Sequence, residues 1–425
     1  MSFIDELSWR GMIHNVMPGV EEELSKGDAT AYIGFDPTAD SLHIGSLVQI
    51  MTLVHFQKSG HKPLALIGGA TGLVGDPSGK SKERNLLSKE TLDSNIKGIT
   101  KQLEQFLDFD CGTNSAEVVN NYDWFDDFSF LGFIRDVGKH ITINYMLSKD
   151  SVKSRMETGM SFTEFTYQLV QGYDFYWLYK NKNCKFQLGG SDQWGNIVTG
   201  TELIRRKDSG DAFAITTPLI QKADGTKFGK TEEGNVWLDP KRTSPYKFYQ
   251  YWINSSDLDA QKYIKIFTLL SKDKIHQLID EHMENPSLRI LQKELAKQVT
   301  TLVHGENHFQ LVKNASEILF QKGKTAIEGL KNMDESLFLE VFEGVPQAEI
   351  NADLIGSLKI VDALSSASNF LKSNGEARRA LKENSISLNK EKVNEDKIIS
   401  KTDLIGSSYI LLQRGKRNYF ILKVV

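Results

Sequence analysis

The chain has few cysteines and no long apolar run. Cys111 and Cys184 are the only cysteines in 425 residues, too few for the framework of disulfides that holds small secreted domains together. The longest stretch without a charged residue, 41–57, includes two histidines and two glutamines. It is too polar and slightly too short to span a bilayer. The first residues also lack a basic segment ahead of an apolar core. We therefore expect no membrane partner and a reducing, cytoplasmic location.

Length and composition describe a folded protein with several domains. At roughly 100 to 200 residues per domain, 425 residues predict two to four domains. Apolar residues make up 40% of the chain, or about 48% when glycine is included, which lies in the usual globular range. This composition excludes disorder as the general state of the chain.

Charge of neither sign dominates the whole chain, but its two ends differ. Lys and Arg total 51 against 55 Asp and Glu, a net charge of −4, which argues against a surface that wraps nucleic acid throughout. Residues 351–425 hold 13 basic and 8 acidic residues, a net +5, and this leaves −9 for residues 1–350. The C-terminal segment is therefore the candidate contact for a polyanion. The alternative is the solvated face of a small surface domain.

Residues 30–245 alternate short β-like runs with helical patterns, which predicts an α/β domain with a Rossmann-like parallel sheet. Ser41 is the predicted N-cap of the helix after the first strand. Because open parallel sheets bind ligands at the carboxyl ends of their strands, the glycine-containing loops that follow the strands are expected to share one site. The alternative for any one loop is a tight βα turn. The expected strands are 31–35, 64–67, 185–188 and 213–216.

The pattern changes after this sheet. From 245 to about 322 apolar residues recur at helical spacing, which predicts an α-helical domain. Residues 323–355 are mixed, and we expect a connector there. The basic segment that follows is expected to form a small α+β domain. Its predicted elements are helices at 359–366 and 375–383 and a hairpin that pairs 409–413 with 419–424.

The first motif with chemical content is His43-Ile44-Gly45-Ser46. It is expected at the start of a helix, where unpaired N–H groups and the helix dipole favour an anion such as phosphate. Gly45 lacks a side chain, so a flat base could lie against the backbone there. The alternative is a satisfied surface or core histidine.

The second motif is Lys227-Phe228-Gly229-Lys230-Thr231. Two ammonium groups on a glycine-containing loop can follow negative charge onto a departing pyrophosphate and so stabilise the transition state. The alternative is a solvated basic turn. No Walker phosphate loop and no Gly-x-Gly-x-x-Gly motif follows the first strand, which weakens kinase and dehydrogenase interpretations.

A polar stripe lies on a helix that is otherwise apolar. Ser161 and Glu164 predict a capping box, and the run after them is rich in aromatic and aliphatic residues, as in a buried helix. Tyr167, Gln171 and Asp174 then share one face. Polar groups on a buried face need polar partners, so the stripe predicts a polar ligand. The alternative is that neighbouring backbone satisfies the three groups.

The two motifs, in this order within an α/β sheet, resemble the paired signatures of class I aminoacyl-tRNA synthetases in altered spelling. Ser46 stands where the commonest form has a second histidine. Further segments resemble the bacterial tyrosyl-tRNA synthetases over nearly the whole chain, and the basic C-terminal segment is similar to their αL RNA-binding domain. These segments are 32–45, 68–80, 190–196 and 227–231.

The resemblance implies a tyrosine–tRNA ligase. Such an enzyme activates L-tyrosine with ATP to tyrosyl-adenylate and pyrophosphate, and then transfers tyrosine to the 3′ end of tRNA(Tyr). ATP is a substrate, Mg²⁺ accompanies its phosphates, and no dedicated protein metal site is expected. The implied domains are a catalytic domain (1–243), an α-helical domain (244–322), a connector (323–355) and the αL domain (356–425).

Family members are homodimers with an interface in an insertion at about 110–165. Aromatic residues of this insertion are expected to supply its apolar area, and ordinary core packing is the alternative. The residues are Tyr122, Trp124, Phe125, Phe128, Phe130 and Phe133.

The resemblance also implies roles for single residues. Asp174 and Tyr32 are expected to bind the phenol hydroxyl of tyrosine, and the other residues of the tyrosine site are Asp76, Tyr167, Gln171 and Gln193. The expected catalytic residues are Thr38, His43, Lys227, Lys230 and Thr231. The expected ATP-binding residues are Asp36, His43, Gly45, Ser46, Gly190, Asp192 and Lys230. The expected RNA-binding residues are Arg378, Arg379, Lys382, Arg414, Lys416 and Arg417.

Two other interpretations compete with this one. A tryptophanyl synthetase, or another nucleotidyl transferase of the same superfamily, would share the two motifs, but Tyr32, Asp174 and the basic C-terminal segment argue against it. An RNA-binding protein on an inactive synthetase scaffold would be expected to lack His43, Lys227 or Lys230, and all three are present.

Overall fold

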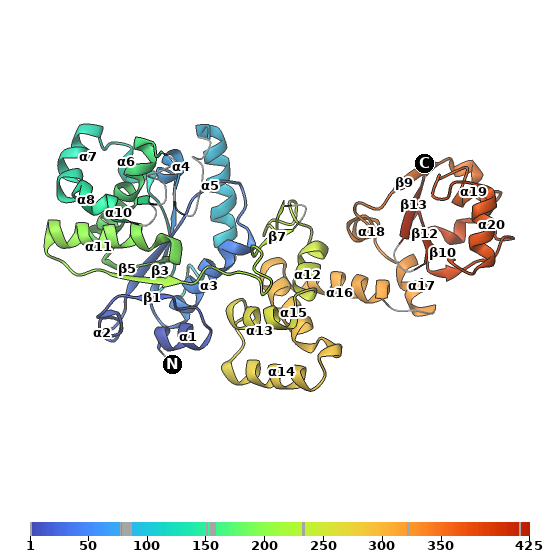
Figure 1. Cartoon of the computed structure of the whole chain (residues 1–425), viewed down its shortest axis with the longest axis horizontal. Coiled ribbons are helices and arrows are strands. Elements are labelled where there is room, and N and C mark those ends of the chain that lie inside the picture. Colours follow the sequence, from blue (N-terminus) through green and yellow to red (C-terminus); the bar gives the residue numbers. More distant parts are fainter. Residues whose placement is uncertain are drawn as a thin grey trace. The chain divides into compact units, whose positions relative to one another are not determined.

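The computed structural model describes the chain as two compact units. One comprises Met1–Thr243 with Trp252–Val299, and the other comprises Ser244–Tyr251 with Thr300–Val425. Figure 1 colours them along the sequence. The described residues are 2–76, 78, 87–149, 152–153, 159–231, 234–320, 324–415 and 418–425.

The first unit is built on a six-stranded sheet in the order β1-β6-β5-β2-β3-β4. All neighbouring strands are parallel except β1, which pairs antiparallel with β6. The four expected strands are confirmed as β2, β3, β5 and β6, whereas the short β1 and β4 were not predicted. The strands are β1 (Asn15–Val16), β2 (Thr30–Phe35), β3 (Lys62–Ile67), β4 (Glu117–Asn120), β5 (Cys184–Gly190) and β6 (Phe213–Thr217).

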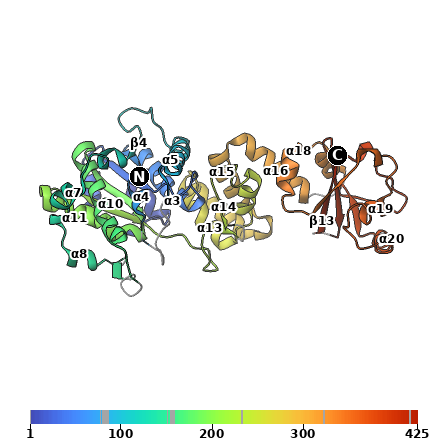
Figure 2. The same ribbon diagram turned by 90° about the horizontal axis from the view of Figure 1, so that it is seen from above.

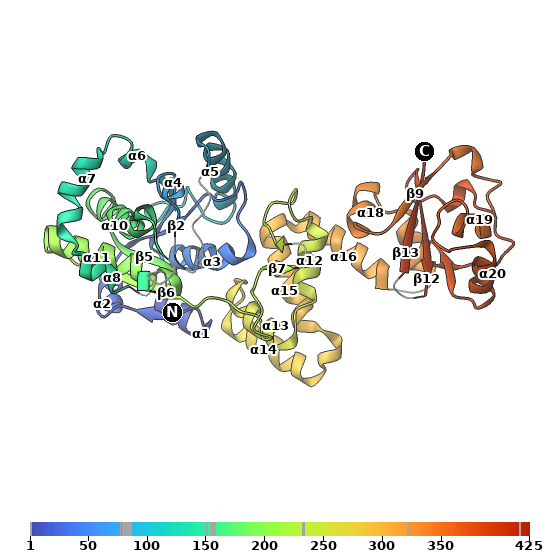
Figure 3. The same cartoon turned by 45° about the horizontal axis from the view of Figure 1, so that its top comes forward.

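Strand order reverses between β2 and β5. The chain proceeds from β2 through β3 to β4 on one side, and from β5 to β6 on the other. Figures 1 and 3 show helices α3 and α5 on one side of the sheet and α10 and α11 on the other. The gap between the carboxyl ends of β2 and β5 is thus a topological switch point, the usual ligand site of such sheets. The helices are α3 (Ile44–Lys58), α5 (Lys89–Leu103), α10 (Phe162–Lys182) and α11 (Trp194–Asp208).

Helix α3 begins differently from our prediction. Its N-cap is His43, whose side chain accepts a hydrogen bond from the Gly45 N–H. Ser41 was the expected cap, but its hydroxyl is buried and donates to the carbonyl of Leu42. The same oxygen accepts from the Gln102 side chain. Contacts with distant parts of the chain therefore override the local capping preference.

Helix α10 confirms the predicted capping box. The Ser161 side chain accepts from the N–H of Glu164, and the Glu164 side chain accepts from the N–H of Ser161. The helix packs along α11 and buries Tyr167 and Asp174. Smaller elements complete this part of the chain: α1 (Phe3–Trp9), α2 (Val20–Leu24), α4 (Thr71–Val74), α6 (Tyr122–Phe125), α7 (Phe130–Asp136), η1 (Gly138–His140), α8 (Ile143–Leu147) and η2 (Ser191–Gln193).

After the sheet the chain forms a small hairpin and then helices. The hairpin joins β7 (Lys230–Thr231) to β8 (Gly234–Asn235). Helices α13 (Asp257–Ile266) and α14 (Lys272–Glu284) and the short η3 (Pro286–Leu288) belong to the first unit. The boundary between the units falls within α12 (Pro245–Ile253) and α15 (Ile290–His304).

The second unit carries a five-stranded sheet in the order β11-β10-β12-β13-β9. Figure 2 shows α19 and α20 on one side of this sheet and α18 on the other. The predicted hairpin is confirmed, with Tyr409 opposite Lys423. The strands are β9 (Gln347–Ile350), β10 (Ile386–Leu388), β11 (Glu391–Lys392), β12 (Tyr409–Arg414) and β13 (Asn418–Val424). The helices are α16 (Glu306–Phe320), α17 (Lys324–Lys331), α18 (Glu335–Val341), η4 (Ala352–Leu354), α19 (Ile360–Leu364), α20 (Asn374–Lys382) and η5 (Lys401–Asp403).

Strand β9 lies inside the stretch 323–355 that the sequence assigned to a connector. It pairs in parallel with β13, and Ile350 packs into the same core as Leu422. Its four residues, Gln-Ala-Glu-Ile, carry little strand signal of their own. Pairing with a strand about seventy residues later decides this conformation, so the sheet begins earlier than expected. In the described part of the chain, no helix has the length and apolarity needed to cross a membrane.

Candidate active site

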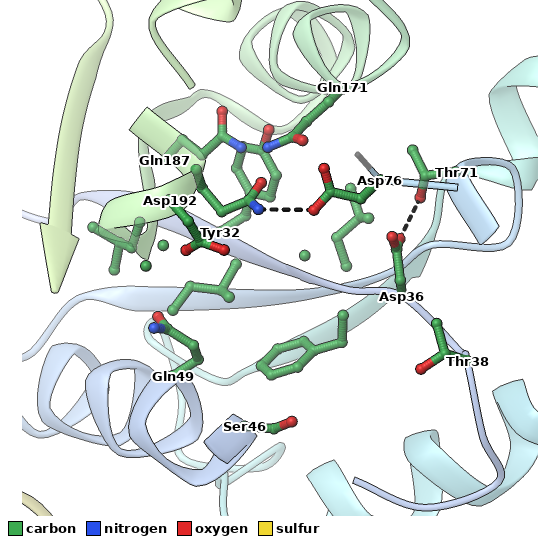
Figure 4. A pocket seen from close by; sticks show the side chains of 18 of the residues that line it. Tyr32, Asp36, Thr38, Ser46, Gln49, Thr71, Asp76, Gln171, Gln187 and Asp192 are labelled. Atoms are coloured by element: carbon green, nitrogen blue, oxygen red, sulfur yellow. Dashed lines mark hydrogen bonds between the residues drawn. The ribbon is translucent and has the colours of Figure 1, made fainter. Parts of the chain in front are cut away.

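A pocket of about 310 Å³ opens at the switch point between β2 and β5. Figure 4 shows side chains from both strands and from α10 pointing into it. Twelve of the residues expected at the tyrosine and ATP sites line this pocket, together with Thr38, which was expected to be catalytic. The twelve are Tyr32, Asp36, His43, Gly45, Ser46, Asp76, Tyr167, Gln171, Asp174, Gly190, Asp192 and Gln193. The tertiary structure therefore brings together residues that are up to 161 positions apart in the sequence.

Asp174 is the most deeply buried acid of the pocket, with 1% of its surface exposed. The side-chain amide of Asn121 donates to one carboxylate oxygen at 3.0 Å, and the indole N–H of Trp124 donates to the other at 2.9 Å. Burial raises the pKa of Asp174 to about 8, although both hydrogen bonds act in the opposite direction. A ligand that donates a hydrogen bond would relieve this cost of burying a carboxylate.

Other buried polar atoms of the pocket lack partners within the described part of the chain. The hydroxyl of Tyr32 is one of them, and burial of this ring raises the pKa of its phenol well above the usual value. The side-chain oxygens of Gln49, Gln171 and Gln187 are also buried without a hydrogen-bond partner among the described residues. An unsatisfied buried polar group costs about 1 to 3 kcal/mol. The pocket is thus prepared for a ligand with several hydrogen-bonding groups.

Asp36 organises the wall opposite these amides. Its carboxylate accepts from the Tyr167 hydroxyl at 3.0 Å and from the Thr71 hydroxyl at 2.8 Å, and Figure 4 marks the second of these bonds. A Cβ on Gly68 would lie 2.2 Å from an Asp36 oxygen and 2.3 Å from the Thr71 hydroxyl. Gly68 is therefore required for this arrangement. Asn121 connects Thr71 to Asp174, because the Asn121 amide that donates to Asp174 also donates to the Thr71 hydroxyl at 3.1 Å.

A third acid, Asp76, lines the pocket from the loop after α4. The Gln193 side chain donates to Asp76 at 2.8 Å, and the Ser78 N–H donates to its other oxygen at 2.9 Å. Asn196 holds the Gln193 amide from the far side at 3.3 Å. Asp76 and Gln193 therefore form one prearranged polar pair, and Figure 4 shows Asp76 and Asp192 directed into the cavity.

The start of α3 forms the outer rim. The Gly45 N–H donates to Nδ1 of His43 at 3.0 Å. A Cβ on Gly45 would lie 2.7 Å from the His43 ring. Glycine at this position thus lets the imidazole fold back over the helix end. The N–H groups of Ile44, Gly45 and Ser46 all have partners, namely the Val236 carbonyl, Nδ1 of His43 and the His43 carbonyl. The prediction of unpaired N–H groups at this helix end was therefore wrong, and the helix dipole is what favours an anion there.

The loop 227–231 reaches this helix end. Gly229 is buried with φ at +80°, and a Cβ there would lie 3.1 Å from Cγ1 of Ile44. Val236 connects the two segments, because its N–H donates to the Gly229 carbonyl at 2.9 Å and its carbonyl accepts from the Ile44 N–H at 3.0 Å. Lys227, Lys230 and Thr231 are exposed, and they lie outside the set of described residues that line the pocket.

Several polar residues in the pocket or next to it were not predicted. Asn121 lies after β4, a strand of four residues that gave no recognisable pattern. Trp124 was expected at a dimer interface, and its indole N–H donates a hydrogen bond to Asp174. The unpredicted polar residues that line the pocket itself are Gln49, Thr71 and Gln187. Thr71 follows the end of β3, which could have suggested it, whereas Gln49 lies inside α3 and Gln187 inside β5.

The expected RNA-binding residues fall in the second unit. Arg378, Arg379 and Lys382 are exposed on α20. Arg414 is half-buried and pairs with Glu376 at 2.7 Å. Lys416 and Arg417 lie outside the described residues.

The family comparison agrees with the fold and the pocket. Residues 24–321 match the family described as tRNA synthetases class I (W and Y). Residues 338–422 match the tyrosine–tRNA ligase SYY-like C-terminal domain. The first match contains every residue of the pocket, and the second lies in the second compact unit.

Relatives that match over their full length are tyrosine–tRNA ligases. The chain is 60% identical over 431 residues to the tyrosine–tRNA ligase of Flavobacterium johnsoniae, with 100% of each chain covered. It is 57% identical over 431 residues to that of Porphyromonas gingivalis, again with 100% of each covered. The crystal structure of a C-terminally truncated Aspergillus nidulans mitochondrial tyrosyl-tRNA synthetase matches at a TM-score of 0.68 and 31% identity, over 75% of this chain and 94% of that one. The chain belongs to the tyrosine–tRNA ligases of class I.

Proposed function

We propose that the pocket activates L-tyrosine with ATP, releasing pyrophosphate, and that the resulting tyrosyl-adenylate then esterifies the 3′ end of tRNA(Tyr). The observation that carries this proposal is the buried pair of Asp174 and Tyr32 at the switch point. Both groups are desolvated, and the Tyr32 hydroxyl has no partner among the described residues. A phenol hydroxyl can donate to Asp174 and accept from Tyr32.

This pair also supports a choice among amino acids. Phenylalanine would fill the same space but leave Asp174 and Tyr32 without a ligand hydrogen bond, as tyrosyl enzymes in general illustrate. Asp76, Gln193, Tyr167 and Gln171 also line the pocket, and they are proposed to bind the ammonium end of tyrosine. An acid beside a cation is favourable in such a partly desolvated site.

The nucleotide is proposed to lie along the start of α3. Thr38 and His43 are proposed to contact its phosphates, Gly45 its adenine and Asp192 its ribose, and Ser46 is proposed to contact the nucleotide. The positive end of the α3 dipole favours phosphates at this position. Asp36 and Gly190 complete the proposed ATP site. Mg²⁺ is proposed to arrive with the phosphates, and the described residues contain no cluster of three or more His, Cys, Asp or Glu side chains suited to hold a metal.

Adenylate formation needs alignment and charge stabilisation rather than a covalent enzyme intermediate. The tyrosine carboxylate attacks the α-phosphate, and the bond to pyrophosphate breaks. Lys227, Lys230 and Thr231 are proposed to follow the charge that develops on the leaving group. The packing of Gly229 against Ile44 supports this role, because it brings the loop to the helix end where the phosphates would lie.

The second unit is proposed to bind tRNA. Its net-positive C-terminal segment exposes Arg378, Arg379 and Lys382 on one helix. Contacts of this kind with phosphates weaken as salt concentration rises. We propose the domain limits given by the sequence, with the helical domain at 244–322 and the αL domain at 356–425. Strand β9 is an added part of the latter sheet.

We further propose a cytoplasmic homodimer. Four large apolar side chains of the insertion and the start of α10 are exposed: Phe130 at 64%, Leu131 at 77%, Ile143 at 65% and Phe162 at 67%. Exposed apolar side chains of this number are typical of an interaction surface. Phe125, Phe128 and Phe133 instead pack around Tyr173, so only part of the aromatic set is available to a partner.

The test is amino-acid-dependent exchange of labelled pyrophosphate into ATP by the purified protein. Tyrosine should support exchange, and phenylalanine and tryptophan at equal concentration should not. Exchange driven by tryptophan would favour the related tryptophanyl activity. RNA binding without exchange would favour the inactive scaffold.

A further inference from the structure

Arg10, directly after α1, is a buried cation bound to the end of α13. It is 3% exposed. Its Nη1 donates to the carbonyl of Lys265 at 2.5 Å and to that of Thr268 at 2.8 Å, and its Nη2 donates to the carbonyl of Leu270 at 2.8 Å. Its Nε donates to Glu6 at 2.8 Å. Helix α13 ends at Ile266, so the Lys265 carbonyl is one that a helix end leaves without an intrahelical partner, and the Thr268 and Leu270 carbonyls lie just beyond the helix.

The other side of this contact leads to α3. Phe3 of α1 packs edge-on against Phe56 of α3, with ring centroids 5.0 Å apart. Glu6 lies 3.9 Å from Nδ1 of His55, also on α3. Burial lowers the pKa of His55 to about 4, so at neutral pH the carboxylate faces a neutral imidazole. Helix α1 is therefore attached by packing to the helix whose start forms the rim of the pocket.

The end of α13 also holds the loop 227–231. Phe228 stacks on Phe267 with ring centroids 5.3 Å apart and an angle of 12° between the planes. Tyr263 and Trp252 close the same cluster at 5.0 Å and 6.0 Å. Phe267 lies between residues 265 and 268, the two whose carbonyls Arg10 binds through one nitrogen. The next loop residue, Gly229, rests on Ile44 at the start of α3.

We propose that Arg10 is a positioning residue that holds the loop 227–231 against the start of α3. The contacts form a closed path from α3 through α1 and Arg10 to α13, then through Phe228 and Gly229 back to α3. Without the guanidinium, three carbonyls lose their donor and Glu6 loses its ion pair. The end of α13 and the aromatic cluster that holds Phe228 then become more mobile. Arg10 touches no substrate in this scheme, and the inference rests on the proposed role of the loop at the leaving pyrophosphate.

The main test replaces Arg10 by methionine, which keeps much of the apolar stem. Trypsin cuts after exposed lysines, so the rate of the first cut at Lys227 or Lys230, followed by mass spectrometry, reports how firmly the loop is held. We expect about a fivefold faster cut in R10M, because local opening becomes easier. The kcat of pyrophosphate exchange should fall about tenfold, while the dissociation constant for tyrosine changes less than about twofold.

The matched control is Arg206 of α11. It resembles Arg10 in bonding to an acid four residues earlier, Glu202, and in donating to a distant carbonyl, that of His140, at 2.8 Å. Its surroundings do not include the loop. The R206M variant should leave both the cleavage rate and the kcat of exchange unchanged, so a general effect of losing an arginine is separated from positioning.

If R10M does not fold, the variants R10K and F228L test the same proposal. R10K keeps the charge but cannot bind three carbonyls and Glu6 together. F228L weakens the same path at its other end. If both act on one path, the R10K/F228L double variant should speed cleavage by less than the product of the two single effects.

The outcomes separate this inference from the proposed function. Cleavage at the wild-type rate in folded R10M or R10K, or independent effects in the double variant, would overturn the positioning role. Faster cleavage in R10M together with undiminished exchange by K230A would support the positioning role and refute the role of the loop in pyrophosphate departure.

Discussion

The indole N–H of Trp124 on α6 donates to the carboxylate of Asp174 on α10 across 2.9 Å. Asn121 donates to the other oxygen of the same carboxylate. The acid proposed to bind the phenol of tyrosine is therefore held by two residues from a segment about fifty positions earlier. Their effect on tyrosine binding can be measured separately from catalysis.

Replacing Trp124 by phenylalanine should weaken tyrosine binding. The substitution removes one donor from a buried carboxylate, a loss of about 1.5 to 3 kcal/mol. We expect the KM for tyrosine in pyrophosphate exchange to rise at least about tenfold, with the KM for ATP nearly constant. The control is W177F, because Trp177 stacks on Trp124 with centroids 4.3 Å apart. Equal changes in both variants would show that packing of the indole pair, not the hydrogen bond, is what matters.

Asp174 should make the stability of the ligand-free protein depend on pH. Its pKa in the folded chain is about 8, above the value of about 3.9 for an exposed aspartate. Between these values the folded chain keeps a proton that the unfolded chain releases, so the free energy of unfolding falls as pH rises, by up to about 1.4 kcal/mol per pH unit. Above about pH 8, Asp174 is ionised in the folded chain as well, and its contribution to the free energy of unfolding no longer changes with pH.

Denaturant unfolding between pH 5 and pH 8 checks this expectation. The D174N variant lacks the titrating group and should lose stability less steeply than the wild type over this range. Parallel slopes for the two proteins would mean that Asp174 is already ionised at pH 5. Saturating tyrosine should stabilise the wild type more than D174N, because a carboxylate accepts a stronger hydrogen bond from the phenol than the neutral amide of asparagine does.

Alanine at position 45 should disturb the start of α3. The added Cβ would lie 2.7 Å from the His43 ring, so the imidazole must move. We expect the rate of pyrophosphate exchange to fall about tenfold to a hundredfold with little change in thermal stability. The control is G138A, because a Cβ on Gly138 meets no atom within 4 Å. Unchanged exchange in G45A would show that the position of His43 is not critical.

Neutralising α20 should separate the two half-reactions. The triple variant R378A/R379A/K382A removes three exposed cations, so charging of tRNA(Tyr) at physiological salt should fall at least about tenfold. Pyrophosphate exchange should stay unchanged, and the salt dependence of RNA binding should become shallower. An equal loss of both activities would contradict the division of labour. Substitutions are preferable to a cut at 356, which would leave β9 without its partner β13.

The C-terminal hairpin and the helix α10 illustrate how much the sequence predicts. The hairpin follows from two β-like runs around a short polar turn, and α10 follows from a capping box and an apolar run. Both signals are local. The same holds for the polar stripe of Tyr167, Gln171 and Asp174, because residues three and four apart share a helix face. These patterns indicated one polar pocket before its depth or its partners were known.

Long-range contacts decided what the sequence left open. Ser41 has the side chain of an N-cap, yet Gln102 binds its hydroxyl and His43 caps α3 instead. Strand β9 exists because β13 returns to pair with it. Asn121 and Trp124 meet Asp174 only because the chain crosses back over the sheet between β4 and β5.

The amino-acid sequence alone thus determined the classes of its segments, the chemistry of its motifs and the family they resemble. Spacing along the chain is enough for these, since helix faces, caps and turns involve neighbours within a few residues. Only the tertiary structure decided which side chains bind Asp174, which rings pack around Phe228 and which carbonyls Arg10 binds. Those partners lie tens to hundreds of residues apart, and burial among many packed groups, rather than any local preference, selects them.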